Sequence, residues 1–490
     1  MEKRQATVDS EADGRWAGPG PLTRRGVLGA AGAGLAALGG PALGAARSLA
    51  PSDKVNLAVI GAGGQGAANM AKLVGQNIVA TADVDYDHVH RSLLDSHFEM
   101  IPTRAPLKEA YDKAQRFGDY RKMFDQRKDI DAVLIATPDH HHAVAARMAM
   151  ERGIHVYVQK PLTYTVEEGR KLLSLAQANP KLVTQMGCQG HSGDNGRRNV
   201  ELIRGGVIGK VHEVHVWTNR PVWPQGVPKP PPQPTPKALD WPTWLGPANV
   251  DWDYAPEYAH FNWRGWVPFG CGALGDMGAH LIDFPFWALE PGLPTRIEAR
   301  HSRWPGNSDL WSTARPAELT GFPLASMTRY EFAKTPKHTT GGGPLRLTWY
   351  DGGFLPPTVP GFPPLLKMNP EGGVLFVGSH GMLMHETYGE NTTLIGEGVA
   401  ERAAKVPQSL PRIAGGMASH EMNWIRAIRG EEKISCPFEY GVRLNETMIL
   451  GIVALKADQP IDWDGAAGRV TNAPDANQYL TRAYRPGWEL

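Results

Sequence analysis

The sequence has little that would tie it to nucleic acid, to a membrane or to a disulfide framework. Its 51 Lys and Arg residues are balanced by 50 Asp and Glu, so no excess charge favours a polyanionic partner. The three cysteines, Cys188, Cys271 and Cys436, have no metal-ligand spacing, and three thiols cannot all pair within one chain. No apolar run suits a membrane span. We therefore expect no nucleic acid, no membrane and no bound metal.

The rest of the composition is that of a folded, loop-rich protein. Hydrophobic residues make up 42% of the 490 residues, which is enough for packed cores and suggests two or more domains. The 56 Gly and 41 Pro residues indicate many turns, because apolar and aromatic residues stay plentiful throughout the chain.

The first 46 residues are typical of an export signal. Arg24 and Arg25 stand directly before a weakly apolar Ala/Gly/Leu run, and small residues around Ala45 and Ala46 suit cleavage. The paired arginines indicate the twin-arginine route, which carries folded proteins, often with a cofactor already bound. The alternative is a disordered tail with a chance arginine pair. We expect residues 1–46 to direct the protein to the periplasm or out of the cell.

A glycine-rich turn follows the first strand that we predict, Val55 to Ile60. A helix is predicted from Ala67 to Leu73, so the turn has a strand before it and a helix after it, as a dinucleotide-binding fingerprint requires. Asp83 ends the next predicted strand, where an acid can bind ribose hydroxyls and favours NAD over NADP. The alternative is a turn without a ligand. The candidate residues of the turn are Gly61, Gly63, Gly64, Gln65 and Gly66.

Two further predicted strands end in residues that suit the same site. An apolar run over 130–136 ends at Thr137-Pro138, and a helix begins near three histidines, of which His142 is a cofactor candidate. Neighbouring residues on a helix point in different directions, so the three histidines are not expected to bind one metal ion. Lys160 follows the next strand, and ligands of open α/β sheets lie at the carboxyl ends of strands. The alternative for Lys160 is a surface lysine.

These motifs, with a later "GDMGAH", resemble the Gfo/Idh/MocA oxidoreductase family. The carrying stretches are "GAGGQG", Asp83, "ATPDHHH", "QKPLT" and "GDMGAH", and the resemblance extends from about Val55 to the C-terminus. It implies an α/β fold with a Rossmann domain (51–183) and an α/β domain (184–490) with a large open, mostly antiparallel sheet. Such a sheet often forms the oligomer interface, so a homodimer or homotetramer is expected. Gln159 stands where the family has Glu, which leaves the role of that position open.

A Pro- and Trp-rich stretch, residues 220–266, interrupts the second domain. Its proline density excludes helix and central strand, so an extended surface loop is expected. It either shapes the site or is a spacer. Its aromatic faces suit stacking on sugars, and ordinary core packing is the alternative for most of them. Seven tryptophans fall in or beside it: Trp217, Trp223, Trp241, Trp244, Trp252, Trp263 and Trp266.

The stretch "GCGALGDMGAHLID" has three interpretations: an acid–base pair, half of a metal site, or a packing corner. On a helix from Gly275, Asp276 and His280 share one face, while apolar side chains such as Met277 and Leu281 face the interior. The resemblance implies that Lys160, Asp276 and His280 are catalytic, with His280 moving the hydroxyl proton and Lys160 stabilising the alkoxide. Weaker candidates for substrate contacts are His191 and Arg264.

Two enzyme functions fit these residues. The first is an NAD-dependent oxidoreductase that acts on a carbohydrate or polyol hydroxyl and keeps its cofactor tightly bound, because an exported enzyme meets no large NAD pool. The second is a redox-neutral glycosidase that oxidises, eliminates, hydrates and reduces with the same NAD. A non-catalytic sugar-binding protein is the third hypothesis, and the complete Lys/Asp/His set argues against it. A small carbohydrate is the expected substrate in both enzyme hypotheses.

Overall fold

A parallel sheet forms the N-terminal part of the structure, a computed structural model that describes residues 54–94, 104–306, 314–333 and 344–490. Its strand order is β3-β2-β1-β4-β5-β6, and every neighbouring pair is parallel. The order reverses between β1 and β4, which is the point where open α/β sheets bind ligands. The strands are β1 (Asn56–Ile60), β2 (Asn77–Ala82), β3 (Gln115–Phe117), β4 (Ala132–Ile135), β5 (His155–Val158) and β6 (Thr184–Met186).

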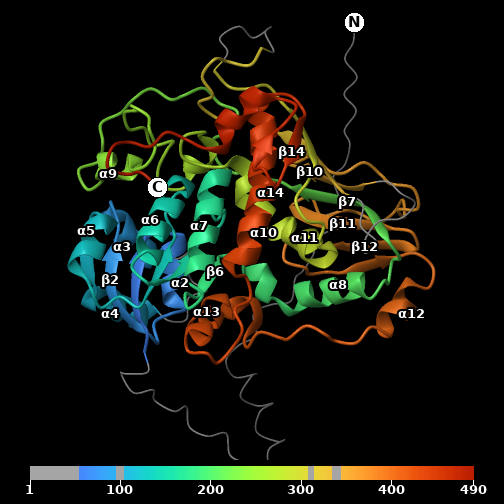
Figure 1. Cartoon of the computed structure of the whole chain (residues 1–490), viewed down its shortest axis with the longest axis horizontal. Coiled ribbons are helices and arrows are strands. Elements are labelled where there is room, and N and C mark those ends of the chain that lie inside the picture. The colour runs from blue at the N-terminus through green and yellow to red at the C-terminus, as the bar shows by residue number, and fades with distance from the viewer. Residues whose placement is uncertain (1–53, 95–103, 307–313, 334–343) are drawn as a thin grey trace, which may run out of the picture. The chain divides into compact units, whose positions relative to one another are not determined.

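Helices connect these strands and cover the sheet (Figure 1). The central strands are apolar and buried, as expected for strands covered on both faces. Helix α7 begins at a capping box, in which the Thr165 hydroxyl accepts from the Glu168 N–H and Glu168 accepts from the Thr165 N–H. The helices are α2 (Gln65–Ala71), α3 (Tyr86–Leu94), α4 (Arg104–Lys113), α5 (Tyr120–Gln126), α6 (Asp139–Met150) and α7 (Val166–Ala178).

The second sheet has nine strands in the order β13-β12-β11-β7-β10-β9-β8-β14-β15. Among the strands in the described residues, only the β7–β10 pair is parallel, so the expected open, mostly antiparallel sheet is confirmed. The strands are β7 (Val211–Thr218), β8 (Arg296–His301), β9 (Ser326–Phe332), β10 (Leu345–Tyr350), β11 (Gly372–Gly378), β12 (Gly381–His385), β13 (Thr393–Ile395), β14 (Ile461–Asp464) and β15 (Arg469–Val470).

Two helices that follow the parallel sheet, α10 and α14, position the candidate site. Helix α14 packs against α7, α10 and β8, so it joins the two sheets through one core. Helix α10 carries Asp276 and His280, and the apolar residues predicted to face inward are buried on α10 and α11. The helices are α8 (Asp194–Arg204), α9 (Trp241–Leu245), α10 (Gly272–Leu281), α11 (Asp283–Leu289), α12 (Val399–Ala404), α13 (His420–Ile428) and α14 (Phe438–Ala457).

The Pro- and Trp-rich segment 220–266, called the insert below, is an ordered layer. Residues 220–240 form no helix or strand, and the short helix α9 and a 3-10 turn (Asn262–Gly265) follow. All seven tryptophans in or beside the insert are buried, and most of them pack in an aromatic cluster with Phe269. Core packing, rather than an exposed stacking surface, is therefore what the structure assigns to most of them.

The predicted export signal, residues 1–46, lies outside the described residues. Among the residues that the structure does describe, no helix combines the length and the apolarity that crossing a membrane requires.

Candidate active site

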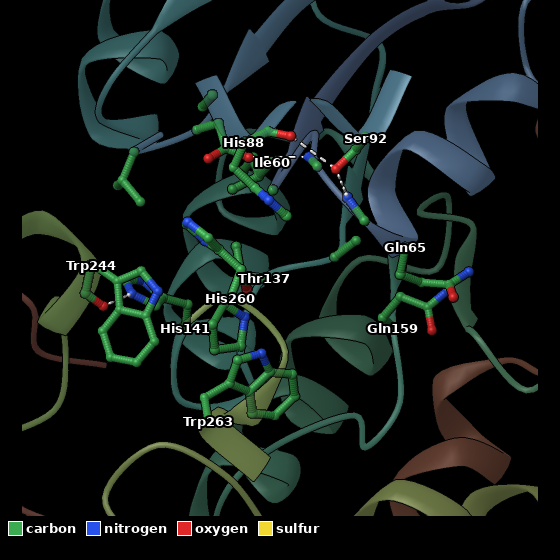
Figure 2. Close-up of a pocket in the computed structure, with 18 of the residues that line it drawn as sticks. Ile60, Gln65, His88, Ser92, Thr137, His141, Gln159, Trp244, His260 and Trp263 are labelled. Atoms are coloured by element: carbon green, nitrogen blue, oxygen red, sulfur yellow. Dashed lines mark hydrogen bonds between the residues drawn. The ribbon is translucent and has the colours of Figure 1, made fainter. Parts of the chain in front are cut away.

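A cavity of about 380 Å³ lies at the carboxyl edge of the parallel sheet. The residues that follow β1, β2, β4 and β5 line one side of it, and the insert supplies the other, with Trp244, His260 and Trp263 (Figure 2). Of the cofactor residues predicted from the sequence, Gly66 and His142 do not line the cavity. Those that do are Gly61, Gly63, Gly64, Gln65, Asp83, Thr137, Pro138 and Lys160.

At each of the three spaced glycines of the turn, an added Cβ would collide with a neighbouring atom. A Cβ on Gly61, whose φ is +76°, would lie 2.7 Å from the Ala136 carbonyl oxygen, so only glycine permits this tight turn. A Cβ on Gly66 would lie 1.8 Å from the Gly61 oxygen, so this glycine lets α2 pack closely on the turn. A Cβ on Gly63 would meet the His88 ring at 2.5 Å. The cradle therefore has the form that a dinucleotide pyrophosphate requires.

Asp83 and Ser92, which both line the cavity, hold the glycine turn through hydrogen bonds to its backbone. Asp83 Oδ2 accepts from the N–H groups of Ala62 and Gly63 at 2.8 and 3.2 Å, and Ser92 Oγ accepts from the Gly64 N–H at 2.9 Å. Burial raises the pKa of Asp83, while hydrogen bonds from backbone N–H groups oppose that rise. Asp83 thus shapes the turn as well as lining the cavity, a second role that the motif alone did not reveal.

A pair of histidines connects the glycine turn to the insert. His88 of α3 stacks on His260 of the insert, with ring centroids 3.9 Å apart and planes 6° from parallel. The Nε2 atom of His260 lies 2.9 Å from Asp85 Oδ2, and the Asp240 N–H donates to the Val84 oxygen at 3.0 Å. Burial lowers the pKa of His88 to about 4, with the charge of His260 adding to the effect. Sequence reasoning missed His88, Ser92 and His260, because no local motif marks them.

Lys160, Asp276 and Arg264 form one ion cluster. Lys160 Nζ donates to Asp276 Oδ1 at 2.8 Å and to its backbone oxygen at 3.0 Å, and Arg264 Nε donates to the same Oδ1 at 2.9 Å. The three side chains are only 14%, 10% and 17% exposed, in the order Lys160, Asp276, Arg264. Although burial raises the pKa of Asp276, the charges of Lys160 and Arg264 hold it well below its usual range. Asp276 is therefore ionised at any ordinary pH.

His280 lies one turn along α10 from Asp276 and is 4% exposed. Its Nδ1 atom is buried and has no hydrogen-bond partner among the described residues, and its ring meets that of Tyr388 edge-on at a centroid distance of 5.2 Å. Burial, reinforced by the charge of Lys160, lowers the pKa of His280 to about 3. The imidazole is therefore neutral at ordinary pH.

The structure gives Gln159 a specific role. Its Nε2 group donates to Asn69 Oδ1 at 2.9 Å, Asn69 donates to Glu421 Oε1, and Lys72 Nζ donates to the same oxygen at 3.1 Å. A glutamate at position 159 could not donate to Asn69 and would bring a second carboxylate into a buried network. The amide is therefore the side chain that this network needs, because Glu421 already supplies the negative charge.

The adjacent histidines of α6 bind backbone carbonyls. The two ring nitrogens of His142 lie 2.7 and 2.9 Å from the oxygens of Pro161 and Thr137, and burial lowers its pKa to about 4. His140 and His141 both approach the Trp244 oxygen, at 3.0 and 2.8 Å. Among the described residues, no group of His, Cys, Asp and Glu is arranged to hold a metal ion. These histidines instead attach α6 to the strand ends and to the insert.

His191 lies away from the cavity wall. Its Nδ1 atom is 3.0 Å from Asp283 Oδ1, its ring stacks on Trp287 at 3.7 Å, and Tyr440 donates to the same carboxylate at 2.6 Å. The side chain is 4% exposed. Its contacts are those of a buried packing network, whereas Arg264, the other weak candidate, lines the cavity.

A parallel sheet has a glycine turn at its switch point, and Lys160, which lines the same cavity, is ion-paired with Asp276, which is not part of the cavity lining. This is the arrangement of a dinucleotide-binding protein of the Rossmann type. Residues 55–186 match a family model described as an oxidoreductase family, NAD-binding Rossmann fold, and residues 202–299 match its C-terminal alpha/beta domain. The chain belongs to the Gfo/Idh/MocA oxidoreductase family, and its cofactor is NAD.

Curated relatives carry two kinds of name. A glycosyl hydrolase family 109 protein of Shewanella sp. (strain MR-4) is 32% identical over 187 residues, which are 34% of this chain and 38% of that protein. The levoglucosan dehydrogenase of Pseudarthrobacter phenanthrenivorans is 27% identical over 236 residues, which are 44% of this chain and 52% of that protein. The chain thus spans 38% and 52% of the lengths of these two relatives.

Solved structures share the fold. The WlbA dehydrogenase from Bordetella pertussis, in complex with NADH and UDP-GlcNAcA, aligns with a TM-score of 0.55 at 13% identity. The alignment covers 84% of this chain and 98% of that one. The myo-inositol dehydrogenase from Lactobacillus casei aligns with a TM-score of 0.50 at 17% identity, covering 87% and 100% of the two chains. At these identities the likeness supports the fold, and the chemistry must come from the site.

Proposed function

We propose that this protein is an NAD-dependent enzyme that oxidises a hydroxyl group of a carbohydrate or polyol and retains its cofactor. One observation carries the proposal: Lys160 lies in the wall of the cavity that holds the glycine cradle and is ion-paired there with Asp276. The levoglucosan dehydrogenase among the relatives supports the choice of a carbohydrate substrate. Export of the enzyme by the twin-arginine route and a homo-oligomeric state, both expected from the sequence and the resemblance, belong to the same proposal.

The residues divide the work of oxidising a carbinol carbon. NAD, when bound, accepts the hydride from that carbon. The neutral imidazole of His280 accepts the hydroxyl proton, and the ammonium group of Lys160 stabilises the negative charge that develops on the oxygen. Asp276 holds the Lys160 side chain in place through two hydrogen bonds. The products are a ketone, reduced NAD and a proton, so atoms and electrons balance.

A redox-neutral glycosidase is the second candidate, and the family 109 relative favours it. In that reaction the ketone acidifies a neighbouring C–H group, a base removes that proton, and the aglycone leaves with a proton. Water then adds, and the hydride returns to the carbonyl carbon. Net redox change is zero, so a single retained NAD suffices. Tyr388 lies against His280 and is a candidate for the second proton transfer.

One assay separates the two reactions. Purified protein without added NAD is incubated with sugars and nitrophenyl glycosides, while released aglycone and reduced nicotinamide are followed together. Aglycone release without net reduction supports the glycosidase, and reduction that a second carbonyl substrate reverses supports the oxidoreductase. Neither signal over a broad panel would contradict both.

Retention of NAD is supported by the contacts that hold the insert against α3 at one side of the cavity. His260 would have to leave His88 and Asp85 before a dinucleotide could pass between the insert and α3. We expect His260→Ala to raise the NAD release rate about 10-fold or more, because a hydrogen bond to a charged group is lost. Stopped-flow displacement of bound NADH measures that rate.

Two variants make the test specific. His260→Asn keeps a donor for Asp85 without the ring, so it separates pairing from stacking. Lys229→Gln changes an exposed insert residue that lies over Trp252, outside the cavity wall, and should leave the rate unchanged. An unchanged release rate in His260→Ala would show that the insert does not retain the cofactor.

A further inference from the structure

The ion cluster has more positive than negative charge. Lys160 and Arg264 both donate to the single oxygen Oδ1 of Asp276, so two cations share one carboxylate. His280 is neutral and adds no compensation. All three charged side chains are less than one-fifth exposed, and a buried charge without a counter-ion is costly. One positive charge is therefore available for a ligand.

Arg264 is the cation that faces this ligand. It belongs to the insert and lines the cavity together with Lys160. Its Nε and Nη1 groups are committed to Asp276 and to the Phe261 oxygen, while the other terminal nitrogen has no protein partner among the described residues. The guanidinium lies 4.1 Å from the ring centroid of Trp263, which fixes its plane. An ordered, desolvated guanidinium suits a carboxylate more than a neutral hydroxyl.

We infer that the substrate is a carbohydrate that carries a carboxylate, such as a hexuronic acid or its glycoside, and that Arg264 binds this carboxylate. The inference rests on the proposed carbohydrate chemistry and adds the substrate class. Lys160 keeps its role at the reacting oxygen, and Arg264 holds the acid group.

A second acid beside the cluster makes this binding depend on pH. Asp139 is 2% exposed; its Oδ2 accepts from the Cys271 N–H, and its Oδ1 has no partner in the part of the chain that the structure describes. Burial raises the pKa of Asp139 to about 7; the charges that act on it are those of Arg264, Asp276 and Lys160, while the Cys271 thiol stays neutral. Below that pH Asp139 is neutral, so it does not offset the excess positive charge of the cluster. Above it, the ionised Asp139 competes with the ligand, so the affinity for a uronate should fall.

The test compares neutral and acidic sugars that differ only at the terminal carbon: glucose with glucuronate, galactose with galacturonate, and their nitrophenyl glycosides. Binding to the NAD-loaded protein is measured by calorimetry, and turnover is measured separately. The wild-type protein should bind at least one uronate more tightly than its neutral partner. Arg264→Gln should weaken uronate binding about 10- to 100-fold, the effect of losing a charged hydrogen bond. Arg264→Lys should restore part of it, and Lys229→Gln should have no effect.

Each outcome is decisive. If neutral sugars are turned over and no uronate binds, the inference that the substrate carries a carboxylate is wrong, and the proposed function still holds. If a uronate binds but is not turned over, the result supports a carboxylate-binding site at Arg264 and contradicts the proposed function. Absence of any sugar binding overturns the inference. If Arg264→Gln weakens NAD binding instead of uronate binding, the guanidinium serves the cofactor phosphates, and the inference is wrong.

Discussion

Replacing Lys160 by Met is expected to lower kcat about 100- to 1,000-fold, the usual cost of removing one group that stabilises a developing oxyanion. The ammonium group donates twice to Asp276 and lines the cavity, so both its charge and its position are lost. The glycine cradle is untouched, and NAD should stay bound. The measurement is single-turnover kinetics, with the NAD content of the purified variant as the second readout.

Lys171→Met is the matched control for this variant. Lys171 is an exposed residue of α7 that pairs with Glu167, so the substitution removes a lysine charge from the same half of the chain without reaching the cavity. Its kcat should equal that of the wild type. Full activity in Lys160→Met would remove the central residue from the proposed site, whereas loss of both activity and NAD would mean that Lys160 serves cofactor binding.

Local patterns were sufficient to predict the parallel sheet and the strand-end residues. The "GAGGQG" turn, Asp83 and Lys160 each follow an apolar run, and the rule that ligands gather at carboxyl ends of strands brings them together without further information. Asp276 and His280 are four apart on one helix, so their shared face also follows from the sequence alone. The Asp276–Lys160 contact bridges 116 residues, and only the family resemblance pointed to it.

The second side of the cavity could not be predicted in this way. His260 and Asp85 are 175 residues apart, and no periodicity in the insert indicates that it folds back on α3. The tryptophans have the same ambiguity, because an aromatic residue in a Pro-rich segment suits a sugar face and a core equally well. Only the packing of the insert, for instance the stack of Trp241 on Trp244 at 4.5 Å, decides for the core.

The charge balance of the site could not be predicted from the sequence either. Arg264 is a weak candidate from the sequence, since an arginine near an aromatic cluster is common. The structure shows its role, because Arg264 contacts the same Asp276 oxygen as Lys160. The Lys–Asp pair is therefore part of a cluster with excess positive charge. Asp139 is a further example, because only its burial beside this cluster changes its protonation.

Replacing Gly66 by Ala is expected to remove NAD binding and to lower the free energy of unfolding. The added Cβ would lie 1.8 Å from the Gly61 oxygen and 2.9 Å from the Gly61 carbonyl carbon, and neither atom belongs to a side chain that could rotate away. Relief requires α2 to move off the turn, which separates the helix N-terminus from the cradle. Overpacking of this kind costs about 1 to 3 kcal/mol or more, whereas the better helix propensity of Ala returns at most about 1 kcal/mol.

Gly75→Ala is the control, because Gly75 lies soon after α2 and a Cβ there would meet no atom within 4 Å. Urea unfolding followed by circular dichroism measures stability, and absorbance of the purified protein measures bound dinucleotide. We expect Gly75→Ala to match the wild type in both. A stable Gly66→Ala protein that still carries NAD would mean that α2 tolerates displacement, and the close packing of helix and turn would then not be what positions the cofactor.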